Sequence, residues 1–201
     1  LYQGFIPTHN AAIVQRYLDA GLIVIGKTNT PEFGLTLTTE PVANGATRNP
    51  WNQGFSTGGS SGGAAAAVAA GIVPVAHATD GGGSIRIPAA CCGLFGLKPS
   101  SGLTSIDNQL GDCWSGMSVG HVVSRSVRDS ALFLDVITLQ QAKLFPIPAT
   151  PVRFATVIDN PPCSLKIALQ IQHPFGEPID PECLQAIEET AQLCESLGHQ
   201  I

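Results

Sequence analysis

A glycine- and serine-rich segment that runs directly into alanines constrains this chain more than any other feature. Residues 54–63 are GFSTGGSSGG, and residues 64–71 are AAAAVAAG. Glycine allows loop conformations closed to other residues, and serine hydroxyls compete for backbone hydrogen bonds, so the first segment should be a loop. Alanine is the best helix former, and its small side chain lets a helix approach its neighbours closely. The sequence therefore predicts a loop that delivers serines to the N-terminus of a buried helix.

A second glycine-rich turn lies farther along the chain. Residues 81–83 are three glycines, and Ser84 comes next. We expect residues 72–76 to form the short strand that leads into this turn. Backbone N–H groups in such a turn can point into one small space and hold a phosphate or the oxyanion of an acyl-transfer intermediate. A phosphate loop requires a lysine soon after its glycines, and none follows either turn, so the sequence favours acyl transfer over nucleotide binding.

The N-terminal segments are typical of an α/β protein. Residues 10–21 have apolar side chains at helical spacing, with Asn10 as the expected N-cap. Residues 22–25 are a continuous apolar run, which predicts a strand buried on both faces. Another helix is expected to open at Pro31, because proline is favoured at the first helical position. This order of elements indicates a sheet covered by helices.

The C-terminal half has clearer helix signals. Residues 126–129 form a capping box ahead of an expected helix at 127–139. Prolines are frequent over 140–163, which predicts a long surface excursion or a subdomain boundary. Residues 166–171 are expected to form a strand. Asp180 and Pro181 should start a last helix over 181–197 that stops at a glycine.

Composition excludes several classes of function. The chain has 201 residues and a net charge of -5, with no cluster of Lys and Arg, which argues against a nucleic-acid surface. The longest apolar core, 64–73, is too short to cross a membrane. Six cysteines without a C-x-x-C pair indicate free thiols, a cytoplasmic location and no metal site.

Charged residues make up only 12% of the chain, about half of the usual ~25% for a free-standing domain. A surface so poor in charge suggests that much of it is covered by other parts of a larger protein. The first residue is Leu1 rather than Met. We therefore expect that the chain lacks both an N-terminal and a C-terminal part.

The first serine loop formally matches the nucleophile elbow of α/β-hydrolases. Residues 58–62 fit G-x-S-x-G, but that elbow follows a strand, whereas residues 49–57 have the composition of coil. One alternative is therefore a Ser-His-Asp hydrolase that uses Ser60 or Ser61 with His121 as its base.

Taken together, the motifs closely resemble the amidase signature family over nearly the whole chain in one register. The two longest matches are GGSSGGA at 58–64 and TDGGGSIRIPA at 79–89. Shorter matches flank them on both sides: GKTN at 26–29, PEF at 31–33, CGLFGLKPS at 92–100 and VSRSVRD at 123–129. The resemblance implies an α/β fold with a mixed, twisted β-sheet covered by helices on both faces. It also implies that residues 1–201 are a partial amidase domain, with 140–163 as an excursion within it.

The resemblance implies a Ser–cis-Ser–Lys triad. Ser84 falls on the family's nucleophile, and Ser60 falls on the cis-serine that relays its proton. The matching lysine of the family would precede Leu1. Lys27 is a poor substitute, because a solvated lysine is protonated at neutral pH and cannot act as a base.

Other residues of the two loops receive supporting roles from the resemblance. Oxyanion and substrate binding fall to the loop residues Gly81, Gly82, Gly83 and Ser61. Asp80 and Arg86 flank the nucleophile with opposite charges and are expected to pair and pin the loop.

The resulting prediction is an amidase that cleaves a carboxamide C–N bond through an acyl-enzyme on Ser84, without a cofactor. Its partner would be a small-molecule amide substrate, with no nucleic acid and no membrane, and a homodimer is left open. The expected activity belongs to the full-length parent, and this chain alone is expected to be inactive. A non-catalytic scaffold is the remaining alternative, because the lysine is absent from these residues.

Overall fold

The computed structural model describes residues 4–104, 114–138, 153–160 and 162–201. The chain divides into two compact units, Leu1–Asp159 and Asn160–Ile201. The division falls inside the proline-rich segment 140–163, most of which lies outside the described residues. Within the described residues, no helix combines the length and apolar character that crossing a membrane requires.

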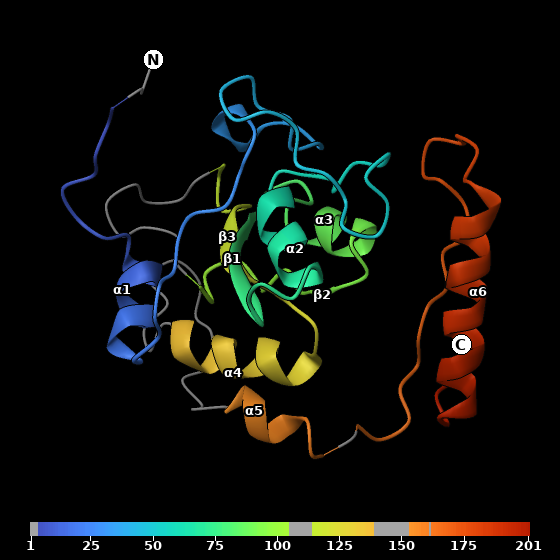
Figure 1. Ribbon diagram of the computed structural model, residues 1–201. Coiled ribbons are helices and arrows are strands. Elements are labelled where there is room, and N and C mark those ends of the chain that lie inside the picture. Colours follow the sequence, from blue (N-terminus) through green and yellow to red (C-terminus); the bar gives the residue numbers. More distant parts are fainter. Residues whose placement is uncertain (1–3, 105–113, 139–152, 161) are drawn as a thin grey trace. The chain divides into compact units, whose positions relative to one another are not determined.

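An antiparallel three-stranded sheet forms the centre of the first unit (Figure 1). Its strands are β1 (Val75–Asp80), β2 (Phe95–Gly96) and β3 (Val119–Ser124), in the order β1-β3-β2. The central strand β3 is buried along its whole length. The sequence predicted a strand at 72–76, but β1 begins later, because Pro74 has no backbone N–H to donate to a partner.

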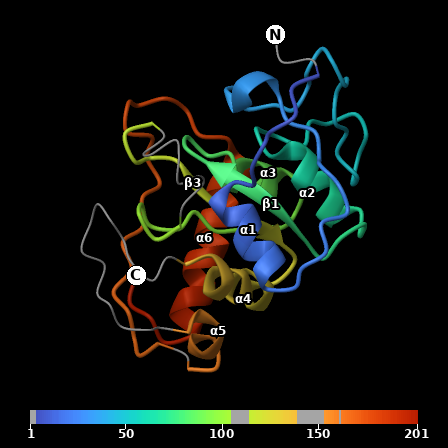
Figure 2. The same cartoon turned by 90° about the vertical axis from the view of Figure 1, so that its left-hand side faces the viewer.

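Helices cover both faces of this sheet, as the sequence predicted (Figures 1 and 2). On one face, α2 (Gly62–Ala69) and α3 (Arg86–Cys91) pack on a cluster of buried residues: Ala64, Val68, Ala78, Ile85, Ala89 and Val123. On the other face, α1 (Ala12–Asp19) and α4 (Val127–Ile137) contribute to a second cluster: Ile13, Tyr17, Val122 and Ile137.

The alanine-rich helix α2 is buried and closely packed, which confirms the expectation from its small residues. A Cβ on Gly63 would collide with the backbone of Asn29, and the Gly63 N–H donates to the Asn29 carbonyl at 3.2 Å. At the other end of α2, Arg125 Nε and Nη2 donate to the carbonyls of Val68 and Ala69 at 3.1 and 3.0 Å. A cation is favourable at a helix C-terminus, and Arg125 supplies the donor for the Ala69 carbonyl, whereas the Val68 carbonyl also accepts from the Gly71 N–H at 3.1 Å.

The strand predicted at residues 22–25 does not form. Ile23, Val24 and Ile25 are 87%, 58% and 71% exposed, and they have no regular secondary structure. A strand is held by hydrogen bonds to a neighbouring strand, and none of the described strands pairs with this segment. The apolar run in the sequence predicted a buried strand, but it could not indicate which strand would pair with it.

Two predicted helix starts differ in detail. Helix α1 is capped by Ala11 rather than Asn10, whose side chain donates to Gln15 Oε1 at 3.0 Å. The helix expected at Pro31 is only a 3₁₀ turn, η1 (Glu32–Gly34), because Phe33 has a left-handed φ of 54° that a helix cannot continue.

The N-cap half of the capping box predicted at the start of α4 is confirmed, whereas the Asp129 carboxylate accepts from the Ser126 hydroxyl rather than from the Ser126 backbone N–H. Ser126 Oγ accepts a hydrogen bond from the Asp129 backbone N–H at 3.1 Å and donates to Asp129 Oδ2 at 2.8 Å. A short helix, α5 (Phe154–Val157), follows in the same unit. Its first N–H groups, those of Phe154 and Ala155, donate to the Asp135 carboxylate at 2.7 and 3.1 Å.

The second unit consists of α6 (Pro181–Ser196) and an extended segment. Asp180 caps α6 as predicted, because its Oδ1 accepts from the Glu182 N–H at 2.9 Å. The strand expected at 166–171 reduces to one parallel bridge between Lys166 and Gln200.

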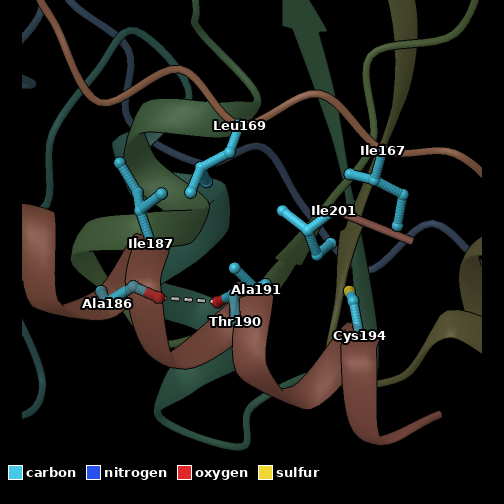
Figure 3. A pocket seen from close by; sticks show the side chains of 8 residues that line it. All are labelled: Ile167, Leu169, Ala186, Ile187, Thr190, Ala191, Cys194 and Ile201. Carbon is cyan, nitrogen blue, oxygen red and sulfur yellow. Dashed lines mark hydrogen bonds between the residues drawn. The ribbon is translucent and has the colours of Figure 1, made fainter. Parts of the chain in front are cut away.

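The second unit contains a hollow of about 320 Å³ (Figure 3). Thr190 supplies its hydroxyl group, which donates to the Ala186 carbonyl at 2.7 Å and is therefore already paired. The lining is otherwise apolar apart from a thiol: Ile167, Leu169, Ala186, Ile187, Thr190, Ala191, Cys194 and Ile201. No acidic or basic side chain lines this hollow, so it lacks the groups for acid–base catalysis.

Candidate active site

The fold brings the two serine loops together. The Ser61 N–H donates to the Ser84 carbonyl at 3.3 Å, which joins positions 23 residues apart in the sequence. The Ser61 hydroxyl lies against the backbone of Thr79 at the end of β1, with its oxygen 3.3 Å from the Thr79 nitrogen and 3.4 Å from its carbonyl oxygen. Ser61 therefore ties the first loop to the strand that leads into the second.

Ser60 lies at the centre of the first loop. The Gly59–Ser60 peptide bond is cis, as the family resemblance implied, and Ser60 is only 5% exposed. A Cβ on Gly34 would lie 3.4 Å from Ser60 Oγ, so the 3₁₀ turn approaches the hydroxyl directly. Among the described residues, the hydroxyls of Ser60 and Ser84 have no hydrogen-bond partner, so neither is committed to a structural contact.

The second loop is wrapped around the carboxylate of Asp80, which is fully buried. The Arg86 guanidinium donates to it from Nε at 2.9 Å and from Nη2 at 3.0 Å. Backbone N–H groups also donate to it, those of Gly83, Ile85 and Arg86 at 2.8, 3.2 and 3.3 Å. Five hydrogen bonds on one carboxylate fix the path of residues 81–86, which agrees with the expected pairing of Asp80 and Arg86.

The same contacts set the charge of Asp80. Burial raises the pKa of the carboxyl, but the hydrogen bonds from Arg86, those from the backbone and the positive charge of Arg86 together hold the pKa below its usual range. Asp80 is thus an ionised anchor at neutral pH. A proton-transfer role would require a pKa near neutrality, so Asp80 is suited to positioning.

One expected oxyanion donor is already used. The Gly83 N–H donates to Asp80 Oδ1, so Gly83 shapes the turn instead of offering a free donor, which corrects the expectation from the sequence. The N–H groups of Gly81, Gly82 and Ser84 have no partner within the described part of the chain. The turn therefore keeps three N–H groups that could bind an oxyanion.

Trp114 is a neighbour of this turn that sequence reasoning missed. A Cβ on Gly81 would lie 3.0 Å from Cε3 of the Trp114 ring, which is 52% exposed. No short motif marks such a contact, because Gly81 and Trp114 are far apart in the sequence. The ring offers an apolar surface beside the potential oxyanion donors.

The structure does not support Lys27 as the base. Lys27 is exposed, and it has no hydrogen bond or ion pair within the described ranges. A general base must lie within hydrogen-bond reach of the proton that it removes, directly or through one water. Neither Ser60 nor Ser84 contacts Lys27 in this way.

The alternative base, His121, is committed elsewhere. His121 is fully buried in β3, and its Nε2 lies 2.7 Å from Ser130 Oγ of α4. Its Nδ1 has no hydrogen-bond partner in the described residues. Burial, and secondarily the charge of His77, lower the pKa of His121 to about 4. A Ser-His-Asp site would need a hydrogen bond from His121 to Ser60 or Ser61. Among the described residues, His121 makes no such bond.

We predict that protonation of His121 makes the fold acid-sensitive. Its pKa is lower in the folded protein than the unfolded value of about 6.5, so the folded state favours the neutral ring. The stabilisation is fully present above pH ~6.5 and is lost as the pH falls toward 4, with a decrease of about 2 kcal/mol between pH 7 and pH 5. Chemical denaturation at both pH values should show that His121→Asn has a flatter pH dependence than the wild type. His9→Asn, at an exposed position, is the matched control, and identical slopes for His121→Asn and wild type would contradict the prediction.

The described cysteines offer neither a reactive thiol at Cys92 nor a group of metal ligands. Five cysteines are described, and all are free. Burial, and secondarily the neighbouring Cys91, raise the pKa of the Cys92 thiol to about 11, which makes Cys92 unreactive. In the described ranges, no three His, Cys, Asp or Glu side chains are grouped closely enough to hold a metal ion. Cys113 lies outside the described residues.

The comparisons with known proteins agree with this geometry. The Amidase family model matches residues 1–201. The 6-aminohexanoate-cyclic-dimer hydrolase of Paenarthrobacter ureafaciens is 44% identical over 207 residues, which cover 98% of this chain and 41% of that protein. The chain thus spans about two fifths of the length of that relative.

Solved structures give the same result. The structure of 6-aminohexanoate cyclic dimer hydrolase matches with a TM-score of 0.88 at 43% identity, over 98% of this chain and 41% of that one. The peptide amidase of Stenotrophomonas maltophilia matches with a TM-score of 0.80 at 30% identity, over 98% of this chain and 42% of that one. This chain belongs to the amidase signature family.

Proposed function

We propose that the full-length polypeptide that carries this chain hydrolyses a carboxamide C–N bond through an acyl-enzyme on Ser84. The contact between the two serine loops supports this most directly, because the Ser61 N–H and the Ser84 carbonyl meet at 3.3 Å. Loops held in this way can place a nucleophile, a proton relay and free N–H donors around one carbonyl group. We also propose that the base lies outside these 201 residues and that they are inactive alone.

The proposed reaction has two halves. Ser84 Oγ attacks the carbonyl carbon, and its proton passes through the Ser60 hydroxyl to a neutral lysine that the family resemblance places before Leu1. The oxyanion accepts hydrogen bonds from the free N–H groups of Gly81, Gly82 and Ser84. The C–N bond then breaks as the proton returns to the leaving amine, and water hydrolyses the acyl ester by the same path.

We propose a small, uncharged carboxamide as substrate. The similar proteins are a hydrolase of a cyclic amide dimer and a peptide amidase, so a cyclic amide and a peptide amide are the first compounds to test. Asp80 and Arg86 neutralise each other beside the turn, and Trp114 offers an apolar ring. Such surroundings favour a neutral acyl group over a charged one.

Covalent labelling tests the assignment of the nucleophile. The full-length polypeptide is treated with a fluorophosphonate, which reacts with activated serines, and the labelled peptide is identified by mass spectrometry. We expect one label, on Ser84, and loss of amide hydrolysis in proportion to labelling. A label on Ser60 or Ser61 would support the Ser-His-Asp alternative, and undiminished hydrolysis after labelling of Ser84 would refute the proposal.

Replacement of Ser60 tests the proton relay. We expect Ser60→Ala to lower kcat by about 10²- to 10⁴-fold, the range for loss of a positioned acid–base group, with little change in KM. Steady-state kinetics on the full-length polypeptide measure both constants. Ser101→Ala is the matched control, because Ser101 is exposed and its hydroxyl donates only to the Gly116 carbonyl. If both variants had the same kcat, Ser60 would have no part in proton transfer.

A further inference from the structure

Thr39 lies outside the serine motifs, yet its hydroxyl is embedded in the first loop. The residue is fully buried in a segment without regular secondary structure. Its Oγ1 lies 3.0 Å from the Gly58 carbonyl oxygen and 3.3 Å from the Ser60 carbonyl oxygen. It also accepts a hydrogen bond from the Gly62 N–H at 3.1 Å. One side chain thus contacts the backbone on both sides of Ser60.

The Ser60 carbonyl depends on this hydroxyl more than the Gly58 carbonyl does. Thr39 has one hydroxyl proton to share between the two carbonyls. The Gly58 carbonyl also accepts from Thr57 Oγ1 at 3.1 Å, so it has a second donor. The Ser60 carbonyl has no other hydrogen-bond partner within the described part of the chain. Loss of the Thr39 hydroxyl would therefore leave a buried carbonyl and the Gly62 N–H unpaired.

The packing around Thr39 leaves the loop little freedom. A Cβ on Gly59 would lie 2.6 Å from the Thr38 carbonyl oxygen, and a Cβ on Gly62 would collide with the Thr39 side chain. The Thr38 backbone and the Thr39 side chain are therefore packed against the loop on both sides of Ser60. Together with the hydrogen bonds of Thr39, this contact restricts the backbone that carries Ser60.

We propose that Thr39 is a positioning residue for Ser60 in the amide hydrolysis, an inference that rests on the proposed function. Thr39 does not touch the reacting atoms, and it acts through the backbone of residues 58–62. A proton relay must lie within hydrogen-bond distance of both its partners, and a displacement of about 1 Å can cost about 100-fold in rate. The Thr39 hydroxyl holds Ser60 within that tolerance.

The test compares variants that keep or remove the hydroxyl. Thr39→Val keeps the shape and removes the hydrogen bonds, whereas Thr39→Ser keeps the hydroxyl and removes a methyl group. In the full-length polypeptide, we expect kcat per active site to fall about 100-fold in Thr39→Val, with KM within about threefold, and to fall less than about fivefold in Thr39→Ser. Active sites are counted by fluorophosphonate labelling taken to completion, so that unfolded molecules do not enter the rate.

Thr190→Val is the matched control, because Thr190 is exposed in α6 and its hydroxyl donates to the Ala186 carbonyl of the same helix. We expect wild-type kcat per site from this variant. If Thr39→Val yields too few folded molecules, Thr39→Ala against Thr39→Ser makes the same comparison, since both lack the methyl group. Equal turnover per site in hydroxyl-free and hydroxyl-bearing variants would overturn the inference. Failure of the proposed function would appear separately, as hydrolysis that survives in Ser84→Ala.

Discussion

Ser84→Ala is expected to lower kcat/KM for amide hydrolysis by about 10⁴- to 10⁶-fold in the full-length polypeptide that carries this chain. Alanine cannot form the acyl-enzyme, and the losses measured for nucleophilic serines in other hydrolases are of this size. The residual rate enhancement of Ser84→Ala would come from the free N–H groups of the turn and from substrate binding. Steady-state kinetics with a cyclic amide and a peptide amide would measure the loss.

The folded state should survive this substitution. The Ser84 hydroxyl has no hydrogen-bond partner in the described residues and is half-buried, so the free energy of unfolding should change by less than about 0.5 kcal/mol. Ser101→Ala serves again as the control, with wild-type activity expected. If Ser84→Ala kept a tenth of wild-type activity, Ser84 would not be the nucleophile.

Asp80→Ala is expected to have the second largest effect, a loss of about 3–5 kcal/mol in the free energy of unfolding and about 10³-fold in kcat. Removing the carboxylate leaves three backbone N–H groups and one side of Arg86 without their acceptor. Each buried unpaired group costs about 1–3 kcal/mol, and partial exposure of Arg86 limits its share. The turn would lose its shape, and the oxyanion donors would lose their alignment. Chemical denaturation and kinetics would measure the two losses.

Asp135→Ala is the matched control for Asp80→Ala. Asp135 also accepts backbone N–H groups, those of Phe154 and Ala155, but it is exposed and has no hydrogen bond to the serine loops within the described residues. We expect its removal to cost under about 1 kcal/mol and to leave kcat unchanged. Equal effects of the two substitutions would show that the turn does not depend on Asp80.

The sequence predicted elements whose causes are local. The alanine run of α2, the Ser126 cap of α4 and the Asp180 cap of α6 form as expected, because each signal lies within one turn of the helix that it starts or fills. The segments 22–25 and 166–171 did not become strands. A strand needs a partner, and the partner is a property of the tertiary structure.

The same distinction applies to the candidate site. Ser60, Ser84 and Asp80 were found because they belong to short motifs, and the structure brings the two loops that carry them into contact. Thr39 and Trp114 were missed, because their contacts with the loops join distant parts of the sequence. The use of the Gly83 N–H by Asp80 was also missed, since composition cannot show which donors of a glycine turn are already paired.

The close packing around the first loop has a consequence for how substrate preference can change. Methyl groups at positions 59, 62 and 63 would strike the backbone or side chains of residues 29, 38 and 39, so the loop tolerates almost no variation from within. The surroundings of the second loop are less restricted. Trp114 is half exposed, and its ring lies beside Gly81. If the proposed function holds, we expect substrate preference to change through substitutions at Trp114 rather than within the loop, which has no room for added side chains.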